Sequence, residues 1–302
     1  MTDVLIVGGG PAGLTAALYA LRAGKSALVL EKNAFGGQIT ASPRVENYPG
    51  LAGVSGLAFA DALVGQVLAL GGALEPAEAC ALELAGTRRA VRTADGGVYE
   101  GRALVLATGA KPRTLGLPRE AGLTGLGVSY CAVCDGAFYR GRTVAVAGGG
   151  DTALQDALFL SDLCEKVFLI HRRDAFRGEA RLAQALAKRP NVEIVWNSRV
   201  TALHGEGALA GLTVTDTAGR ARQLAAEGLF VAIGQEPETQ LFAGAARLDA
   251  AGCADAGEDC AGALPGVFVA GDCRRKPVRQ LTTAVSDGTV AALAAAAWLD
   301  GQ

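Results

Sequence analysis

The sequence predicts an α/β fold for this 302-residue chain, because one glycine-rich strand–turn–helix pattern occurs twice. The first copy has G-x-G-x-x-G at Gly8–Gly13, and the second has G-x-G-x-x-A at Gly148–Ala153. Each turn lies between an apolar, strand-like run and a helical stretch, as in a βαβ unit. One such motif is a weak signal, but two of them predict two Rossmann-like, three-layer dinucleotide-binding domains.

The first unit begins almost at the N-terminus. Val4–Val7 is a short β-rich run, a helix is expected from Leu14 to about Ala23, and Gly24 suits its C-terminal cap. Ala27–Leu30 is the next expected strand. The second unit repeats this order, with a strand at 143–147, a helix to about residue 163 and a strand at 166–170.

The residues after the second strand of each unit distinguish the two nucleotide sites. Glu31 stands as far beyond Gly8 as His171 stands beyond Gly148. A carboxylate there can accept hydrogen bonds from a ribose 2′-hydroxyl, as in FAD. The second unit instead has His171-Arg172-Arg173, with Arg177 one helical turn further, and guanidinium groups suit the 2′-phosphate of NADP(H). A solvated loop is the alternative interpretation of these arginines.

The second unit is predicted to be inserted into the first. Residues 111–118 contain two prolines and a glycine after an apolar strand, which is typical of a linker. After about residue 243 the chain is expected to return to the first domain, with a strand over 266–272 that ends in Gly271-Asp272. We therefore expect an FAD domain at 1–113 and 245–302, and an NADPH domain at 114–244 that carries a cysteine pair. The apolar run 290–299 is expected to form a buried C-terminal helix.

Cys131 and Cys134 form the cysteine pair with a reactive spacing. A C-x-x-C segment can close a small redox-active disulfide, and Asp135 could move a proton as thiol and thiolate interchange. Asp135 could also be a turn-forming residue before Gly136. A zinc site would need two further cysteine or histidine ligands at suitable spacing, so no metal site is expected. The other five cysteines are expected to be packing residues, with Cys273 of most interest because it follows Asp272.

Composition excludes several classes of protein. The formal net charge is −2 and there is no basic stripe with aromatics, so no nucleic-acid partner is expected. With only two histidines, a Cys-His or Ser-His hydrolytic site is not expected. The N-terminus has no secretory signal pattern and the longest apolar run is too short to span a bilayer, so we expect no membrane association and a cytoplasmic location.

In this order and spacing, the motifs resemble the bacterial-type, low-molecular-weight thioredoxin reductases over essentially the whole chain. The matching segments are 8–13, 36–38, 46–50, 107–109, 131–136, 148–153, 171–177, 232–234, 271–272 and 279–280. The resemblance implies that electrons pass from NADPH through FAD to Cys131–Cys134 and on to a thioredoxin disulfide. It further implies that Cys134 faces the flavin, Cys131 attacks thioredoxin and Asp135 is the acid/base residue.

The resemblance also implies a homodimer whose domains rotate about linkers near 113–116 and 243–247, with Gly116 and Gly244 as hinge glycines. The expected FAD-binding residues are Gly8, Gly10, Pro11, Ala12, Gly13, Glu31, Lys32, Gly37, Gln38, Asn47, Thr108, Gly109, Gly271, Asp272, Arg279 and Gln280. The expected NADPH-binding residues are Gly149, Gly150, Asp151, Thr152, His171, Arg172, Arg173, Arg177, Ile233 and Gly234.

This chain departs from the family pattern at two places. Val133 stands where the family usually has threonine, and Asp151-Thr152 stand where it usually has Asn-Ser. The Asp151 carboxylate would hinder pyrophosphate binding unless it points away or caps the helix. Three alternatives share the fold: a ferredoxin-fed disulfide reductase, a disulfide reductase with another partner, and a non-catalytic flavin-binding protein. Loss of the arginines would favour the ferredoxin-fed reductase, and loss of the cysteines, of Asp135 or of the arginines would favour the non-catalytic protein. None of these losses is present.

Overall fold

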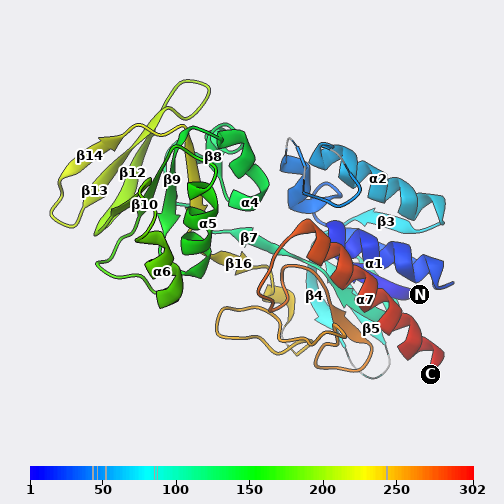
Figure 1. Cartoon of the computed structure of the whole chain (residues 1–302). Helices are drawn as coiled ribbons and strands as arrows, with labels where there is room; N and C mark the ends of the chain where they lie inside the picture. The colour runs from blue at the N-terminus through cyan, green and yellow to red at the C-terminus, as the bar shows by residue number, and fades with distance from the viewer. Residues whose placement is uncertain (43, 46, 52, 85, 87, 243) are drawn as a thin grey trace. The chain divides into compact units, whose positions relative to one another are not determined.

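The computed structural model describes residues 1–302 except residues 43, 46, 52, 85, 87 and 243. The chain divides into two compact units, the first formed by 1–111 and 236–302 and the second by 112–235 (Figure 1). The inserted arrangement expected from the two glycine turns is therefore present. Each unit has its own apolar clusters and is described by itself.

The first unit is built on one mixed sheet, in which β3, β2, β1 and β6 are parallel neighbours and β5 and β4 continue the sheet antiparallel. The C-terminal strand β17 pairs in parallel with the second part of β6. The strands are β1 (Thr2–Val7), β2 (Ala27–Glu31), β3 (Ala73–Pro76), β4 (Ala79–Glu83), β5 (Arg89–Thr93), β6 (Val98–Leu106) and β17 (Val267–Val269). The helices are α1 (Pro11–Arg22), η1 (Gly37–Ala41), α2 (Gly56–Ala69), η3 (Gln240–Phe242) and α7 (Leu281–Asp300).

Alternation along β1 separates the two faces of this sheet. Val4 and Ile6 pack with α1 and α7 in one buried cluster. Leu5 and Val7 pack on the opposite face, in a cluster that includes Phe242. A central strand with apolar side chains on both faces is typical of a sheet covered on both sides. The sheet is thus the middle of three layers. Helices α1 and α7 lie side by side and form the layer on one face of it (Figure 1).

The second unit contains a fully parallel sheet in the order β11-β10-β9-β15-β8. Its strands are β8 (Val128–Ser129), β9 (Thr143–Gly148), β10 (Lys166–Ile170), β11 (Val192–Val195) and β15 (Gly228–Ala232). One face packs on α5 (Asp151–Ser161) through Val144, Val146 and Leu169. The other face packs on an antiparallel sheet of β12 (Ser198–His204), β13 (Gly211–Asp216) and β14 (Ala221–Leu224). The remaining elements are α3 (Glu120–Leu123), α4 (Ala132–Asp135), η2 (Gly136–Tyr139) and α6 (Ala180–Leu186).

The predicted strand–turn–helix units are confirmed, and their boundaries shift by a few residues. The helix expected from Leu14 begins at Pro11, because the helix starts directly at the glycine turn and proline is favoured at its first position. The expected strands over 143–147 and 166–170 are β9 and β10. The antiparallel sheet β12–β14 was not anticipated.

The second domain boundary differs from the expected one. The chain re-enters the first unit at 236 and not at 245, after β16 (Gln235–Pro237) pairs with β7 (Ala110–Pro112). The residues that follow β16 are packed on the first unit. The Glu238 N–H donates to the Gly109 carbonyl, and Phe242 is fully buried in the apolar cluster that contains Leu5 and Val7. The expected linker at 243–247, whose residue 243 lies outside the described residues, is therefore preceded by chain already packed on the first core.

Candidate functional site

The first glycine turn brings the start of α1 close to the edge of the sheet. Gly8 has a φ of +107°, and a Cβ there would lie 2.3 Å from the Ala107 carbonyl oxygen. At Gly13 a Cβ would lie 1.8 Å from the Gly8 carbonyl oxygen, so only glycine allows the helix to approach the strand this closely. Gly10 caps α1 without a side-chain hydrogen bond, and the first turn has no acidic residue. The free N–H groups and the helix dipole suit a pyrophosphate.

Glu31 is fixed beside this turn at the end of β2. Its Oε2 accepts the Gly9 N–H at 2.7 Å, and its Oε1 accepts the Asn33 N–H at 2.8 Å. Each carboxylate oxygen has a second lone pair, so the group can still accept a ribose hydroxyl. Lys32 turns instead to Glu238, 2.9 Å away, and this hydrogen bond raises the lysine pKa.

Gln38 and Thr108 also engage the chain near Glu238. The Gln38 amide donates to the Ala110 carbonyl, and the Thr108 hydroxyl donates to the Glu238 carbonyl. The structure therefore places these two expected FAD residues around the end of the 106–110 segment.

A buried ionic cluster lies where α7 meets the Gly271 turn. Asp287 accepts hydrogen bonds from the Gly271 N–H at 3.0 Å, from the Arg274 guanidinium at 2.8 Å and from the Lys276 ammonium at 2.9 Å. Asp272 Oδ1 is buried and has no hydrogen-bond partner in the described part of the chain, and the Lys276 Nζ lies 3.5 Å away. Burial raises the Asp272 pKa, while the charges of Lys276 and Arg279 oppose that rise. An unsatisfied buried acceptor of this kind fits a hydroxyl of a polar cofactor chain.

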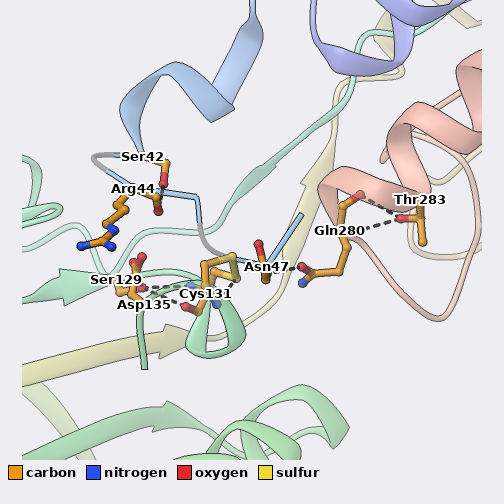
Figure 2. The surroundings of a disulfide bond; sticks show 9 residues. Ser42, Arg44, Asn47, Ser129, Cys131, Asp135, Gln280 and Thr283 are labelled. Carbon is orange, nitrogen blue, oxygen red and sulfur yellow. Dashed lines mark hydrogen bonds between the residues drawn. A yellow bond between two sulfur atoms is a disulfide. The ribbon is translucent and has the colours of Figure 1, made fainter. Parts of the chain in front are cut away.

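Three more expected FAD residues flank this cluster. The Arg279 guanidinium donates to the Asp272 carbonyl at 3.3 Å. Gln280 is the N-cap of α7 and forms a capping box with Thr283. Figure 2 shows the Asn47 amide donating to the Gln280 side-chain oxygen, at 3.2 Å.

In the second unit, the expected site residues follow the carboxyl ends of neighbouring parallel strands. The glycine turn follows β9, the arginine segment follows β10, Ile233-Gly234 follow β15, and the cysteine turn follows β8. Ligands bind at this edge of open α/β sheets. Topology thus gathers the expected nucleotide residues and the cysteine pair at one edge of one sheet.

The second glycine turn is packed against His171. A Cβ at Gly149 would lie 2.1 Å from the imidazole ring, so glycine is required there. His171 is buried, its Nε2 lies 3.1 Å from the Ala175 carbonyl, and burial lowers its pKa. His171, which we expect to contact NADPH, lies with its ring against the Gly149 turn. Gly150 caps α5 without a side-chain hydrogen bond, which leaves N–H groups for an anion.

The arginine loop lies beside this turn, because the Arg177 N–H donates to the Gly149 carbonyl at 2.9 Å. Arg172, Arg173 and Arg177 are exposed, and their guanidinium groups have no acidic partner among the residues that the structure describes. Asp151 does not cap α5; its Oδ1 accepts the Glu179 N–H at 2.7 Å. Its carboxylate is therefore bound to the loop that precedes α6, although Asp151 remains an acidic residue in the first turn of α5. Thr152 is exposed at the start of α5.

The cysteine turn contains a disulfide between Cys131 and Cys134 (Figure 2). Cys131 is the N-cap of the short helix α4, and its Sγ accepts the Cys134 N–H at 3.2 Å. Asp135 ends the helix, and its burial raises its pKa. Ser129 was missed by the sequence analysis, although its hydroxyl donates to Asp135 Oδ2 at 2.7 Å. A serine two residues before a backbone N–H that it binds is a common local motif, and this was the available signal.

A parallel sheet that carries an arginine-marked dinucleotide turn and a disulfide on one edge defines a nucleotide-dependent disulfide oxidoreductase. Residues 2–288 match the model of the pyridine nucleotide-disulphide oxidoreductase family. The chain is 41% identical to a thioredoxin reductase of Streptomyces clavuligerus, over 98% of this chain and 94% of that one. It is 39% identical to a bifunctional thioredoxin reductase/thioredoxin of Mycobacterium leprae, over 98% of this chain and 66% of that one. The crystal structure of a thioredoxin reductase from Streptococcus pyogenes superposes with a TM-score of 0.94 at 36% identity, over 100% and 99% of the two chains.

The chain therefore belongs to the pyridine nucleotide-disulphide oxidoreductase family. It is an oxidoreductase, and its cofactors are FAD and NADPH. Within the described residues, no helix is long and apolar enough to cross a membrane, and no group of three potential ligands is arranged to hold a metal ion.

Proposed function

We propose that this enzyme uses NADPH to reduce the disulfide of a thioredoxin, through the pair Cys131 and Cys134. The observation that carries the proposal is the Cys131–Cys134 disulfide, which lies on the same sheet edge as the arginine-marked glycine turn. The M. leprae relative, a bifunctional thioredoxin reductase/thioredoxin, supports the choice of partner.

The overall reaction consumes NADPH, one proton and the thioredoxin disulfide, and yields NADP⁺ and two thiols. FAD, when bound, supplies the redox chemistry between the NADPH hydride and the Cys131–Cys134 disulfide. In the reduced pair, the Cys131 thiolate attacks one sulfur of the thioredoxin disulfide and breaks that S–S bond. Cys134 then attacks Cys131 Sγ, which re-forms the internal disulfide and releases the second thioredoxin sulfur. Asp135 supplies the proton that the departing thiolate takes up.

We assign the cofactors to the expected residues. FAD is held by the Gly8–Gly13 turn, Glu31 and Asp272, together with the residues around them, including Gly37 and Gly109. NADPH is held by the Gly149–Gly150 turn, with its 2′-phosphate on the arginine loop. The support for this assignment is the pair of uncapped helix starts, the unsatisfied Asp272 oxygen and the exposed guanidinium groups. The arginines also favour NADPH over ferredoxin as the electron source.

We further propose a cytoplasmic homodimer in which the two units rotate about the strands β7 and β16. Free cysteines at five positions in the described chain, four of them buried, are typical of a reducing compartment. Exposed Leu57 and Leu68 on α2 offer apolar surface for a second copy. Light scattering of the purified protein tests the assembly, and a monomeric mass would contradict it.

The function is tested with the purified, FAD-loaded protein. NADPH should bleach the flavin absorbance faster than NADH by about tenfold or more, because only NADPH carries the phosphate that the guanidinium groups bind. Steady-state turnover should then require a thioredoxin. Cys134→Ser should still permit bleaching and abolish turnover. Bleaching without transfer to any thioredoxin would indicate another disulfide partner, and persistent turnover of Cys134→Ser would remove the pair from the mechanism.

A further inference from the structure

Ser129 ends the strand β8 at the carboxyl edge of the parallel sheet. It is 4% exposed and pairs in register with Phe230 of β15, so its backbone is fixed by the sheet. The cysteine turn begins two residues later. The sheet therefore holds the hydroxyl in place next to the cysteine turn. The helix of that turn, α4, has only four residues.

The Ser129 hydroxyl makes two hydrogen bonds that join both ends of the turn. It donates its proton to Asp135 Oδ2 at 2.7 Å and accepts the Cys131 N–H at 3.1 Å (Figure 2). The Cys131 carbonyl, at 3.3 Å, is the alternative acceptor for that proton. A hydroxyl has a single proton, and the shorter bond to a carboxylate is the stronger one. The hydroxyl thus links the Asp135 carboxylate to the backbone of Cys131.

We propose that Ser129 is a positioning residue of the redox turn, whose hydroxyl holds the Asp135 carboxylate in register with Cys131. The proposal rests on the proposed role of Asp135 as the proton donor to the departing thiolate. Ser129 keeps its own proton throughout the exchange. It positions the Asp135 carboxyl group, which gives up its proton to the departing thiolate, and the resulting carboxylate is then reprotonated from water.

The hydroxyl also sets the proton affinity of Asp135. Burial raises the Asp135 pKa, and the hydrogen bond from Ser129 lowers it, because it stabilises the charged form. Three further titratable groups lie on elements that pack against α4. They are Tyr139 on η2, whose pKa is raised by burial and then by Asp135, and Asp151 and Asp156 on α5. None of them donates a hydrogen bond to Asp135 in the described structure, so Ser129 is the group that opposes burial there.

The experiment measures the pH dependence of Cys131 alkylation in the holoenzyme after dithiol reduction, followed by mass spectrometry of the Cys131 peptide. It uses neither thioredoxin nor NADPH, so failure of the proposed partner or electron source leaves the measurement intact. Ser129→Ala should move the inflection that belongs to Asp135 to higher pH by about one unit, because a charge-assisted hydrogen bond is lost. Ser129→Thr keeps the hydroxyl and should retain the wild-type profile.

Two controls make the result specific. Ser198 is another buried serine of the same unit, and its hydroxyl donates to the Trp196 carbonyl at 2.8 Å, so Ser198→Ala should leave the profile unchanged. In an Asp135→Asn background, Ser129→Ala should add no shift. An unshifted Ser129→Ala profile, or an equal shift in the Asp135→Asn background, would overturn the proposal. If Ser129→Ala does not fold, Ser129→Val is compared with Ser129→Thr. Valine and threonine have the same shape, so the two variants differ only in the hydroxyl.

Discussion

At the residue scale, Asp156 is a titratable group outside the cysteine turn with a strongly raised pKa. It is half-buried on α5 and has no hydrogen bond or ion pair in the described part of the chain. Burial raises its pKa from 3.8 to about 7. Since nothing compensates its charge, the carboxyl is held in its neutral form at mildly acidic pH.

This group should make the stability of the protein fall as the pH rises. Between about pH 4 and about pH 7 the folded chain holds a proton that the unfolded chain has lost, so the folded state binds more protons. Asp156→Asn removes that titration and should be more stable than wild type by about 1–2 kcal/mol at pH 8, with little difference at pH 4. Urea unfolding at both pH values checks this prediction.

The exposed Glu165 of the same unit provides the matched control. Glu165→Gln should change the unfolding free energy equally little at both pH values. If Asp156→Asn showed the same pH dependence as wild type, the buried carboxyl would not be its source.

Residue-scale prediction from the sequence succeeded where the signal was local. The C-x-x-C spacing, together with its place just before the second glycine turn, favoured a Cys131–Cys134 disulfide, and the disulfide is present. The hydrogen bonds of Ser129 and the raised pKa of Asp156 were not anticipated, because serine and aspartate are common in turns and on helix surfaces. Their roles depend on what is packed around them, and a one-dimensional pattern does not encode that environment.

At the element scale, both glycine turns bring a helix start close to a strand, and the first one has no room for a side chain at Gly8 or Gly13. Gly13→Ala would place a methyl group 1.8 Å from the Gly8 carbonyl oxygen, which is backbone and cannot move aside cheaply. The start of α1 would be displaced from the pyrophosphate that we propose it binds. We expect the purified variant to retain about tenfold less FAD, measured as the ratio of flavin to protein absorbance.

Gly65 lies within α2 of the same unit, and a Cβ there would meet nothing within 4 Å. Gly65→Ala should keep its FAD and be slightly stabilised, since alanine favours a helix by up to about 1 kcal/mol over glycine. Full FAD occupancy in Gly13→Ala would show that the close approach of α1 is dispensable.

Strands and helices with strong periodicity were predicted correctly because their patterns are short-range. Strands β9 and β10 lie where expected. The helix expected over 290–299 is also present, as the second half of the longer helix α7. The antiparallel sheet β12–β14 was not anticipated. Its strands are held by pairing with one another and by covering one face of the parallel sheet, so their stability depends on tertiary contacts rather than on local propensity.

At the scale of the whole molecule, the inserted unit has the properties of an independent domain. Its buried apolar clusters consist entirely of residues from 112–235. The strands where the chain enters and leaves it, β7 and β16, pair with each other, so its two ends lie close together. Adjacent ends and a private core are what allow a domain to be inserted into another.

The isolated segment 112–235 should therefore fold alone and bind NADP⁺. We expect a cooperative thermal transition by circular dichroism, and calorimetric binding of NADP⁺ that is about tenfold or more tighter than that of NAD⁺. Replacing Arg172 and Arg173 by glutamine in this fragment should remove the preference without unfolding it. An unfolded fragment would mean that the unit depends on the rest of the chain.

The sequence by itself determined that this protein has two dinucleotide-binding units, one marked by Glu31 and the other by arginines, and a cysteine pair at C-x-x-C spacing. These features can be predicted from glycine spacing and short-range apolar periodicity, because steric limits on the backbone and side chains act between residues that are close in sequence. Only the tertiary structure decided that the chain returns to the first unit at 236, that Asp272 keeps an unsatisfied buried oxygen, and that Ser129 links Asp135 to Cys131. All three features depend on how segments of the folded chain pack against one another and exclude water. This packing, and the burial of polar groups that results from it, exists only in the folded protein.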